Sequence, residues 1–445
     1  MTATTVAPDK GPGPSSQQVS SRGARAQPPT PDERSARGRA ERAEVPRSSH
    51  GGWQPPADRR SPVALLEEQA RSRVPELVPV RYGRMLLSPL TFFRGAAYVM
   101  AADLASTPNT GLHAQLCGDA HLSNFGGYAA PDRRLVISVN DFDETLTGPF
   151  EWDVKRLVAS FAVAGRERNF DAQQRQSINV AVSRSYREAS RSFAAMRNLD
   201  VWYARLDVDD AFGRFAAEAS PKAVTRAQQN VTKARAKDSL KAFSKLTETV
   251  DGRVRIASDP PVVVPIEAVF EKQTSEEIGA TLRGIIRSYS RTLEGDRRHL
   301  LDRFQYVHAA RKVVGVGSVG TRAWILLFVG RDGDDPLFLQ AKEAEASVLE
   351  AFLGKSRFTN HGQRVVEGQR FMQAASDIML GWTRARGADG VQRDFYVRQL
   401  WDEKGAALVE TMSPRTMRIY AEICGWTLAR AHARSGDAIA IGSYL

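Results

Sequence analysis

The chain has 445 residues, 42% hydrophobic and 25% charged, with a formal net charge of +11. This composition is ordinary for a globular protein, and the length allows two or three domains, or one two-lobed domain with a tail. No run approaches the roughly 18 apolar residues of a transmembrane helix, and the first residues lack the apolar core of a secretory signal. Cys117 and Cys424 are too few and too far apart to indicate a disulfide framework, so we expect free thiols and a cytoplasmic protein.

The positive charge does not by itself indicate a nucleic-acid partner. Ten Lys and Arg against six Asp and Glu lie within residues 1–60, and acidic residues are interspersed through the remainder. No basic run is interleaved with aromatic side chains, as a nucleic-acid surface would require. A positive balance also suits an enzyme whose substrates carry phosphates. We therefore expect neither nucleic acid nor a membrane as partner.

Residues 1–60 hold nine of the 22 prolines and few large apolar side chains. Such a segment cannot bury enough surface to offset the entropy of ordering it, so we expect a disordered tail. A short helix is predicted at 64–73 and a longer one at 88–105, where Ser88 can cap the helix and Pro89 suits its first turn.

Two β-like runs follow at 113–121 and 134–141, and the chain then reads as mainly helical from 151 to about 312, with 151–167 clearly amphipathic. Near residue 311 the pattern becomes rich in β-branched residues and glycine. Later segments predict strands and helices at 311–330, 335–344, 361–376, 378–384, 394–401 and 416–437.

This order of elements predicts an α+β protein with a small β-rich lobe late in a largely helical chain. The expected parts are a tail (1–60), a mainly helical lobe (61–310), a β-rich lobe (311–402) and a C-terminal helix that returns to the helical lobe (403–445).

The first motif that carries chemistry is C-G-D-A-H-L-S-N at 117–124. Asp119 and Asn124 have the D-x-x-x-x-N spacing of a phosphotransferase catalytic loop. In such a loop the aspartate accepts the proton of an attacking hydroxyl, and the asparagine holds a metal ion on the phosphates. His121 is a candidate for ordering the loop. The alternative without a catalytic role is a turn in which these side chains form hydrogen bonds with local backbone groups.

The second motif is V-N-D-F-D-E at 139–144, 22 residues beyond Asp119. Two carboxylates one residue apart, directly after a β run, suit Mg²⁺, which prefers hard oxygen ligands. By analogy with the D-F-G element of kinases, Asp141 would bridge the metal, and Asp143 would be a second carboxylate at the same site.

The third motif is G-V-G-S-V-G at 315–320, followed by T-R-A-W-I-L-L-F-V-G. A dinucleotide-binding fold needs a helix after these glycines, whereas this sequence predicts strand, turn and strand. That arrangement is typical of the glycine-rich lid over ATP phosphates in kinases. Gly315, Gly317, Ser318 and Gly320 are therefore candidate nucleotide-binding residues.

Lys342 stands on the next predicted strand, 22 residues after the last of these glycines. It shares a strand face with Phe338 and Gln340. A lysine at this place would contact the α- and β-phosphates and pair with a glutamate on the following helix. Glu367 is the preferred partner, and Glu350 is the alternative.

These motifs resemble the aminoglycoside-phosphotransferase and choline-kinase branch of the protein-kinase-like superfamily, whose loop reads H-G-D-x-H-x-x-N followed by I-D-F/W-D/E. Cys117 stands where that pattern has histidine. The segments R-Y-G-R-M, F-F-R-G-A-A, C-G-D-A-H-L-S-N-F-G, N-D-F-D-E-T-L-T-G-P-F-E-W-D-V-K-R-L and G-Q-R-V-V-E-G-Q-R are more closely similar to the bacterial family catalogued as domain of unknown function 2252. This resemblance runs from about residue 75 to the end and implies a kinase-like fold.

The motifs stand in a different order from that of an ordinary kinase, in which the lid and lysine precede the catalytic loop. A circular permutation of the bilobal kinase-like fold accounts for this order. The segment Y-A-E-I-C-G-W-T-L-A-R-A-H-A-R-S-G-D at 420–437 resembles the helix that normally precedes the catalytic loop, although the helix at 88–105 could take the same place.

The sequence thus predicts an ATP- and Mg²⁺-dependent phosphotransferase acting on a hydroxyl of a small molecule. Asp119 would be the base, Asn124 and Asp141 would hold the metal, and Lys342 would hold the phosphates. Two alternatives stay open: a nucleotide-binding pseudokinase without catalysis, and a kinase-fold enzyme that transfers another group, such as AMP.

Overall fold

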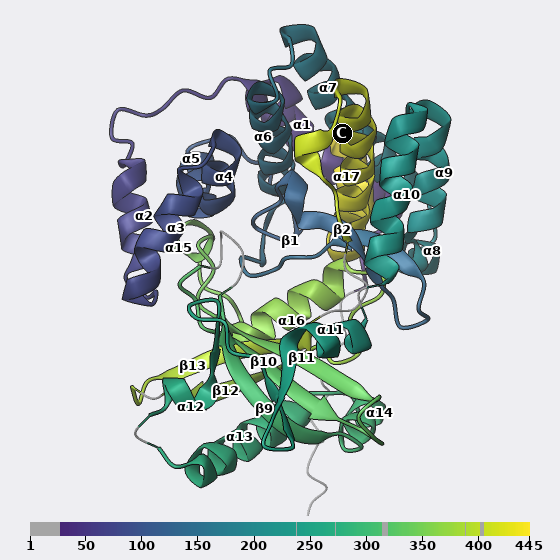
Figure 1. Cartoon of the computed structure of the whole chain (residues 1–445). Coiled ribbons are helices and arrows are strands. Elements are labelled where there is room, and N and C mark those ends of the chain that lie inside the picture. Colours follow the sequence, from purple (N-terminus) through teal and green to yellow (C-terminus); the bar gives the residue numbers. More distant parts are fainter. Residues whose placement is uncertain (1–26, 237, 272, 314–318, 388, 401–404) are drawn as a thin grey trace, which may run out of the picture.

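The computed structural model describes residues 27–236, 238–271, 273–313, 319–387, 389–400 and 405–445. Within them the chain forms a mixed α and β fold with one six-stranded, one four-stranded and two two-stranded sheets. Figure 1 shows the six-stranded sheet at one end of the molecule and most of the long helices at the other. The α+β class expected from the sequence is confirmed. None of the helices in this described part is long and apolar enough to cross a membrane.

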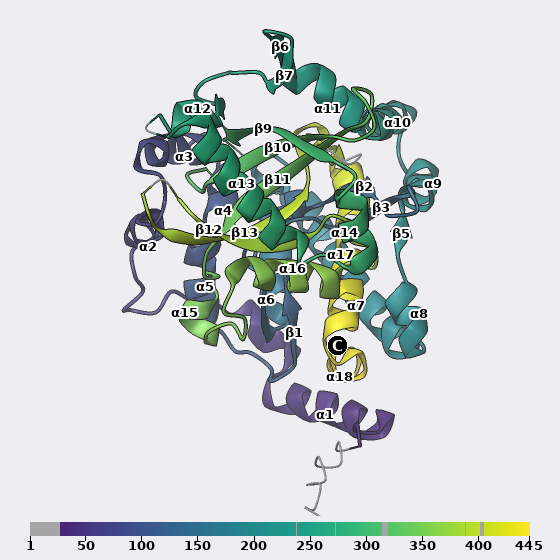
Figure 2. The ribbon, with the colours of Figure 1, turned by 90° about the horizontal axis from the view of Figure 1, so that it is seen from below.

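Helix α1 (Pro31–Glu44) lies within the segment expected to be a disordered tail. Thr30 and Glu33 form a reciprocal capping box at its start. Figure 2 shows α1 beside α18 (Ala438–Tyr444), and Gly38 lies too close to the α18 backbone for a side chain to fit. The expectation of a disordered tail is therefore wrong for this helix, because a contact with the far end of the chain provides the burial that its composition lacks.

Short helices occupy the chain between α1 and the first strand. The helix expected over 88–105 is divided at Ala96, whose φ of −111° and ψ of 34° end one helix before the next begins. The elements are η1 (Arg47–Gly51), α2 (Pro62–Ala70), η2 (Pro75–Leu77), α3 (Val78–Met85), α4 (Pro89–Gly95) and α5 (Ala97–Ala105).

Two small sheets carry the first two motifs. In the two-stranded sheet β1 pairs antiparallel with β4, and the four-stranded sheet has the order β14-β2-β3-β5. The bounds are β1 (His113–Leu116), η3 (Leu122–Asn124), β2 (Phe125–Ala129), β3 (Leu135–Val139), β4 (Leu146–Pro149), β5 (Leu206–Asp207) and β14 (Gly405–Ala406).

The helical core is built around α6 (Glu151–Glu167), α7 (Ala172–Ala194) and α17 (Pro414–Ser435). Helix α17 runs alongside α7, and the apolar faces of the three helices share one core with the segments that flank β1 and β2. This core fixes the position of the loop that follows β1. The connecting elements are α8 (Asn198–Tyr203), α9 (Val208–Glu218), α10 (Pro221–Arg235), α11 (Ser239–Leu246), β6 (Thr247–Val250), β7 (Arg253–Ile256) and η5 (Val409–Thr411).

The six-stranded sheet is antiparallel throughout, with the order β12-β13-β11-β10-β9-β8. Its strands are β8 (Val263–Pro265), β9 (Gln305–Lys312), β10 (Ala323–Val329), β11 (Pro336–Ala344), β12 (Gly381–Arg386) and β13 (Gln392–Gln399). The sheet therefore begins well before residue 311, and the sequence boundary at 310 is too late.

Helices cover both faces of this sheet. In Figure 2, the view from below, α13 lies in front of the strands, and the apolar sides of α12, α13 and α14 pack on that face. We call it the outer face. The opposite, inner face contacts α11 and α16. The bounds are α12 (Ile266–Val269), α13 (Ser275–Ser290), α14 (Gly295–Leu301), α15 (Glu350–Leu353) and α16 (His361–Met372).

The pairing register assigns side chains to these two faces. Lys342 is paired with Ala323 on one side and with Tyr396 on the other, and paired residues point to the same face. All three therefore belong to the inner face. Ala341 and Phe395, their neighbours in sequence, belong to the outer face.

Candidate catalytic site

The two polar motifs of the helical part lie side by side because their strands are paired. The catalytic loop follows β1, and the acidic segment that ends at Glu144 leads into β4, the partner of β1. The Asn140 N–H donates to the Asn124 carbonyl oxygen at 3.0 Å. Gly118 has a φ of +81° and lies against the Glu144 carbonyl, so a side chain at this position would displace one of the two segments.

One face of α6 holds the catalytic loop in place. The Asp153 carboxylate accepts the N–H groups of Cys117 at 2.8 Å and Gly118 at 3.0 Å. The Ser160 hydroxyl oxygen accepts the Leu122 N–H at 3.0 Å. Because these donors are buried, the helix satisfies backbone groups that would otherwise be costly to leave without partners.

Asp119 is held by a buried arginine. Arg156 Nε lies 2.7 Å from Asp119 Oδ1, and its side chain is 3% exposed against 18% for Asp119. The same guanidinium donates to the Phe93 carbonyl oxygen at 2.8 Å. The other oxygen, Asp119 Oδ2, lies 3.7 Å from His121 Nε2. Asp119 is thus oriented through one oxygen, which leaves the other for a further contact.

His121 is uncharged at neutral pH. Burial, with the nearby charges of Arg156 and Arg94, lowers the pKa of His121 to about 4 although Asp119 opposes the shift. Its Nδ1 accepts the Ser123 N–H at 3.2 Å, which assigns the remaining proton to Nε2, the atom that faces Asp119. The structure therefore places His121 where it can order the loop.

The acidic motif meets Lys342 of β11. Lys342 Nζ forms an ion pair with Asp143 Oδ2. Burial raises the pKa of Asp143, but the charge and hydrogen bond of Lys342 outweigh burial and hold that pKa below its usual value. Burial also raises the pKa of Asp141, and for Asp141 the effect of burial prevails over the attraction of Lys342.

Lys342 does not pair with either glutamate named from the sequence. Glu367 instead contacts Arg370, 3.5 Å away on the same helix. Glu350 lies 3.8 Å from Arg364 Nε. The expected Lys342–Glu367 pair is therefore wrong for this structure. The Lys342 ammonium pairs with Asp143, and Glu367 pairs with Arg370, one turn away on the same helix.

Arg364 is the residue of α16 that reaches the acidic motif. It is 2% exposed, and its guanidinium donates to the carbonyl oxygens of Asp143 at 2.8 Å, Thr145 at 2.7 Å and Glu345 at 2.7 Å. Gly368, one turn further along α16, packs so closely on Thr145 that a methyl group would overlap it. These contacts fasten the acidic motif to the strand end that carries Lys342.

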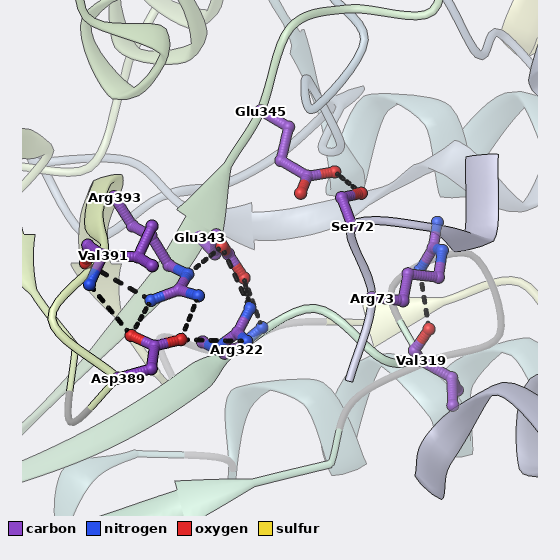
Figure 3. Close-up of polar contacts among 9 residues, drawn as sticks. All are labelled: Ser72, Arg73, Val319, Arg322, Glu343, Glu345, Asp389, Val391 and Arg393. Carbon is purple, nitrogen blue, oxygen red and sulfur yellow. Dashed lines mark hydrogen bonds and ion pairs between the residues drawn. The ribbon is translucent and has the colours of Figure 1, made fainter. Parts of the chain in front are cut away.

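The glycine-rich segment is described only at its end. Gly315, Gly317 and Ser318 lie outside the described residues. Gly320 has a φ of +91°, and its carbonyl oxygen accepts the Val74 N–H at 2.8 Å. Figure 3 shows the adjacent contact, in which Arg73 donates to the Val319 carbonyl oxygen at 2.6 Å. The N-terminal segment thus holds the end of the expected lid.

The oxygen donors here fit a magnesium ion that takes its other ligands from phosphates and water. Asp141 Oδ1 is buried and has no hydrogen-bond partner among the residues that the structure describes. The Asn124 amide nitrogen donates to the Asp119 carbonyl oxygen at 2.8 Å, which leaves its amide oxygen as the atom for a cation. Within the described ranges, no three His, Cys, Asp or Glu side chains form a metal site by themselves.

The C-terminal helix ends beside the strand that leads into the catalytic loop. The Ser435 hydroxyl oxygen accepts the Gln115 N–H at 3.2 Å, and Gly436 lies directly against His113. One turn earlier, His432 Nε2 lies 3.4 Å from the Asp153 carboxylate. Of the two helices considered for the place before the loop, α17 makes these contacts.

Several residues of the site were missed in the sequence, among them Asp153, Arg156 and Ser160. They stand at positions i, i+3 and i+7 of an amphipathic helix, so they share one face. Asp153, Arg156 and Ser160 are all buried. Polar residues at that spacing on the apolar face of a helix could have indicated that these side chains bind other polar groups inside the protein.

Comparison with known proteins gives a family but no named relative. A family model described as "Uncharacterized protein conserved in bacteria (DUF2252)" matches residues 73–445. No curated protein and no solved structure matches the chain. The match covers both polar motifs, Lys342 and the whole six-stranded sheet, so the chain belongs to the DUF2252 family.

Proposed function

We propose that this protein is an ATP- and Mg²⁺-dependent phosphotransferase acting on a hydroxyl of a small molecule. The observation that carries the proposal is the convergence of three sequence-distant groups. Lys342 from the sheet pairs with Asp143, beside Asp141 and next to the loop that holds Asp119. A buried lysine and an unpartnered carboxylate oxygen at one place suit phosphate groups and the cation that accompanies them.

Each residue has a role in this reaction. The acceptor hydroxyl would attack the γ-phosphorus as the bond to the ADP oxygen breaks, and Asp119 Oδ2 would take the hydroxyl proton. Arg156 and His121 would keep that oxygen turned toward the acceptor. Lys342 would release Asp143 to contact phosphate oxygens. Magnesium, held by Asp141 and Asn124, would neutralise charge on the phosphates.

The bilobal, circularly permuted kinase-like arrangement is part of the proposal. It is supported by the inner-face lysine on the third long strand of an antiparallel sheet and by α17 ending beside β1. In the ordinary kinase order, the helix that corresponds to α17 would lead directly into β1 and the loop that follows it.

The experiment is incubation of the purified protein and Mg²⁺ with ATP labelled at either the γ- or the α-phosphate, in the presence of a bacterial small-molecule extract. We expect the γ label to appear in an acceptor fraction, with loss of transfer in Asp119→Asn. Transfer of the α label would instead indicate adenylyl transfer. Binding of ATP without transfer of either label would indicate a pseudokinase and overturn the proposal.

A further inference from the structure

A cavity of about 370 Å³ lies on the outer face of the six-stranded sheet, away from Lys342. Its floor is formed by outer-face residues of five neighbouring strands, and α12 and α13 form its roof. The volume corresponds to about twelve water-sized groups, within the range of small-molecule sites. The apolar lining includes Phe270, Ile278, Leu282, Trp324, Leu326 and Phe395.

Two polar atoms in this lining have no hydrogen-bond partner in the part of the chain that the structure describes. Thr383 is 3% exposed and its Oγ1 is buried, yet no donor or acceptor reaches it. Arg311 Nε is also buried and has no partner among the described residues, within which that arginine forms an ion pair with Glu76, 3.9 Å away and 65% exposed. Because unpaired buried donors are costly, both atoms point to a ligand that supplies the missing partners.

Four of the other charged side chains around the cavity pair with one another, and a further arginine of the lining, Arg386, is exposed. Figure 3 shows Arg322 and Arg393 joined to Glu343 and Asp389 by ion pairs. Two arginines and two carboxylates in one network leave no net charge. Arg311, at the other end of the cavity, is partly exposed (27%), but its buried Nε is a donor that none of the described residues accepts.

The sheet register gives the separation of the two unpartnered atoms. Arg311 lies on β9 and Thr383 on β12, four strand spacings apart in the order β12-β13-β11-β10-β9. At about 4.8 Å per spacing, the two strands are roughly 19 Å apart. A compact ion cannot reach both, so the ligand must be elongated, with an apolar middle section.

We propose that this cavity binds an elongated organic anion of the fatty-acid type, with its acid group at Arg311. Its chain would lie along Trp324, Leu326 and Phe395, with the far end directed toward Thr383. The proposal is independent of the catalytic function. Such a ligand would also contact Val74, whose N–H donates to the Gly320 carbonyl oxygen. It would therefore touch the residue that holds the end of the expected lid.

The test is isothermal titration of the full-length protein with dodecanoate and, separately, with dodecyltrimethylammonium, both below their micelle concentrations. We expect dodecanoate to bind at one site per chain and at least tenfold more tightly than the cation of equal chain length. Arg311→Met keeps the aliphatic stem and should weaken dodecanoate about tenfold. The matched control, exposed Arg303→Met, should bind as the wild type does.

A second variant tests the proposal independently if Arg311→Met fails to fold. Thr281 is exposed at the rim of the cavity, so Thr281→Trp can block the entrance without disturbing the core. It should abolish dodecanoate binding and leave the circular dichroism spectrum unchanged. Equal affinity for the two surfactants, several equivalent sites per chain, or unchanged binding in either variant would overturn the proposal.

Discussion

Replacing Asp153 by asparagine should weaken the hydrogen bonds that hold the loop after β1 against α6. The carboxylate is 1% exposed and accepts two backbone N–H groups, from Cys117 at 2.8 Å and Gly118 at 3.0 Å. Asparagine keeps one acceptor oxygen and turns an NH₂ group toward the second N–H. Hydrogen bonds to charged groups contribute about 1.5–3 kcal/mol each, and a buried donor left unpaired costs about as much. We therefore expect a loss of about 2–4 kcal/mol in the free energy of unfolding.

That loss is large against the roughly 5–15 kcal/mol that stabilises a typical domain. The assay is urea unfolding followed by circular dichroism, at constant pH, for the wild type and the variant. Asp58→Asn is the matched control, because Asp58 is exposed and the same chemical change there should alter the free energy by less than about 0.5 kcal/mol. If Asp153→Asn changes stability no more than the control, the anchoring role of this carboxylate is refuted.

Three further outcomes follow from contacts at the site. Gly368→Ala should destabilise the protein by about 1–3 kcal/mol in thermal unfolding, because the added methyl overlaps Thr145, directly after the acidic motif. The control Gly284→Ala, in open space on α13, should be neutral or stabilising. Burial raises the pKa of Glu144 to about 7. The contribution of this group to stability is therefore full below its usual pKa of 4.5 and is lost as the pH rises to about 7. In Glu144→Gln, the free energy of unfolding should depend less on pH between about pH 5 and 7.5. Arg156→Met should lower the rate of phosphoryl transfer at least tenfold with little change in ATP affinity measured by titration, since it orients Asp119 and not the nucleotide; an equal loss of affinity would contradict that role.

Local spacing predicted which polar residues of the candidate site lie near one another, because these residues belong to two short segments. Asp119 and Asn124 lie five positions apart, and a turn between two β runs brings Asp141 back to the same place. Alternation along one strand also assigned Lys342 to the face shared with Gln340. These inferences needed only the period of a strand and the length of a loop.

The partners that come from other parts of the chain could not be predicted in this way. The pairing of Lys342 with Asp143, in place of a glutamate on α16, depends on how the sheet packs on the acidic motif. Arg364 was readable as a residue of that helix, but its three carbonyl partners were not. Helix α1 is a similar case, since its burial depends on α18 at the opposite end of the chain.

The most direct test of the central claim is titration of Mg²⁺ and ATP into the wild type, Asp141→Asn and Lys342→Met. The control Lys355→Met changes an exposed lysine away from the site. If the separated motifs form one nucleotide site, the wild type and control bind one ATP per chain only with Mg²⁺, and both site variants bind at least tenfold more weakly. A folded wild type that binds neither ATP, GTP nor ADP, or variants that bind ATP unchanged, would contradict the account.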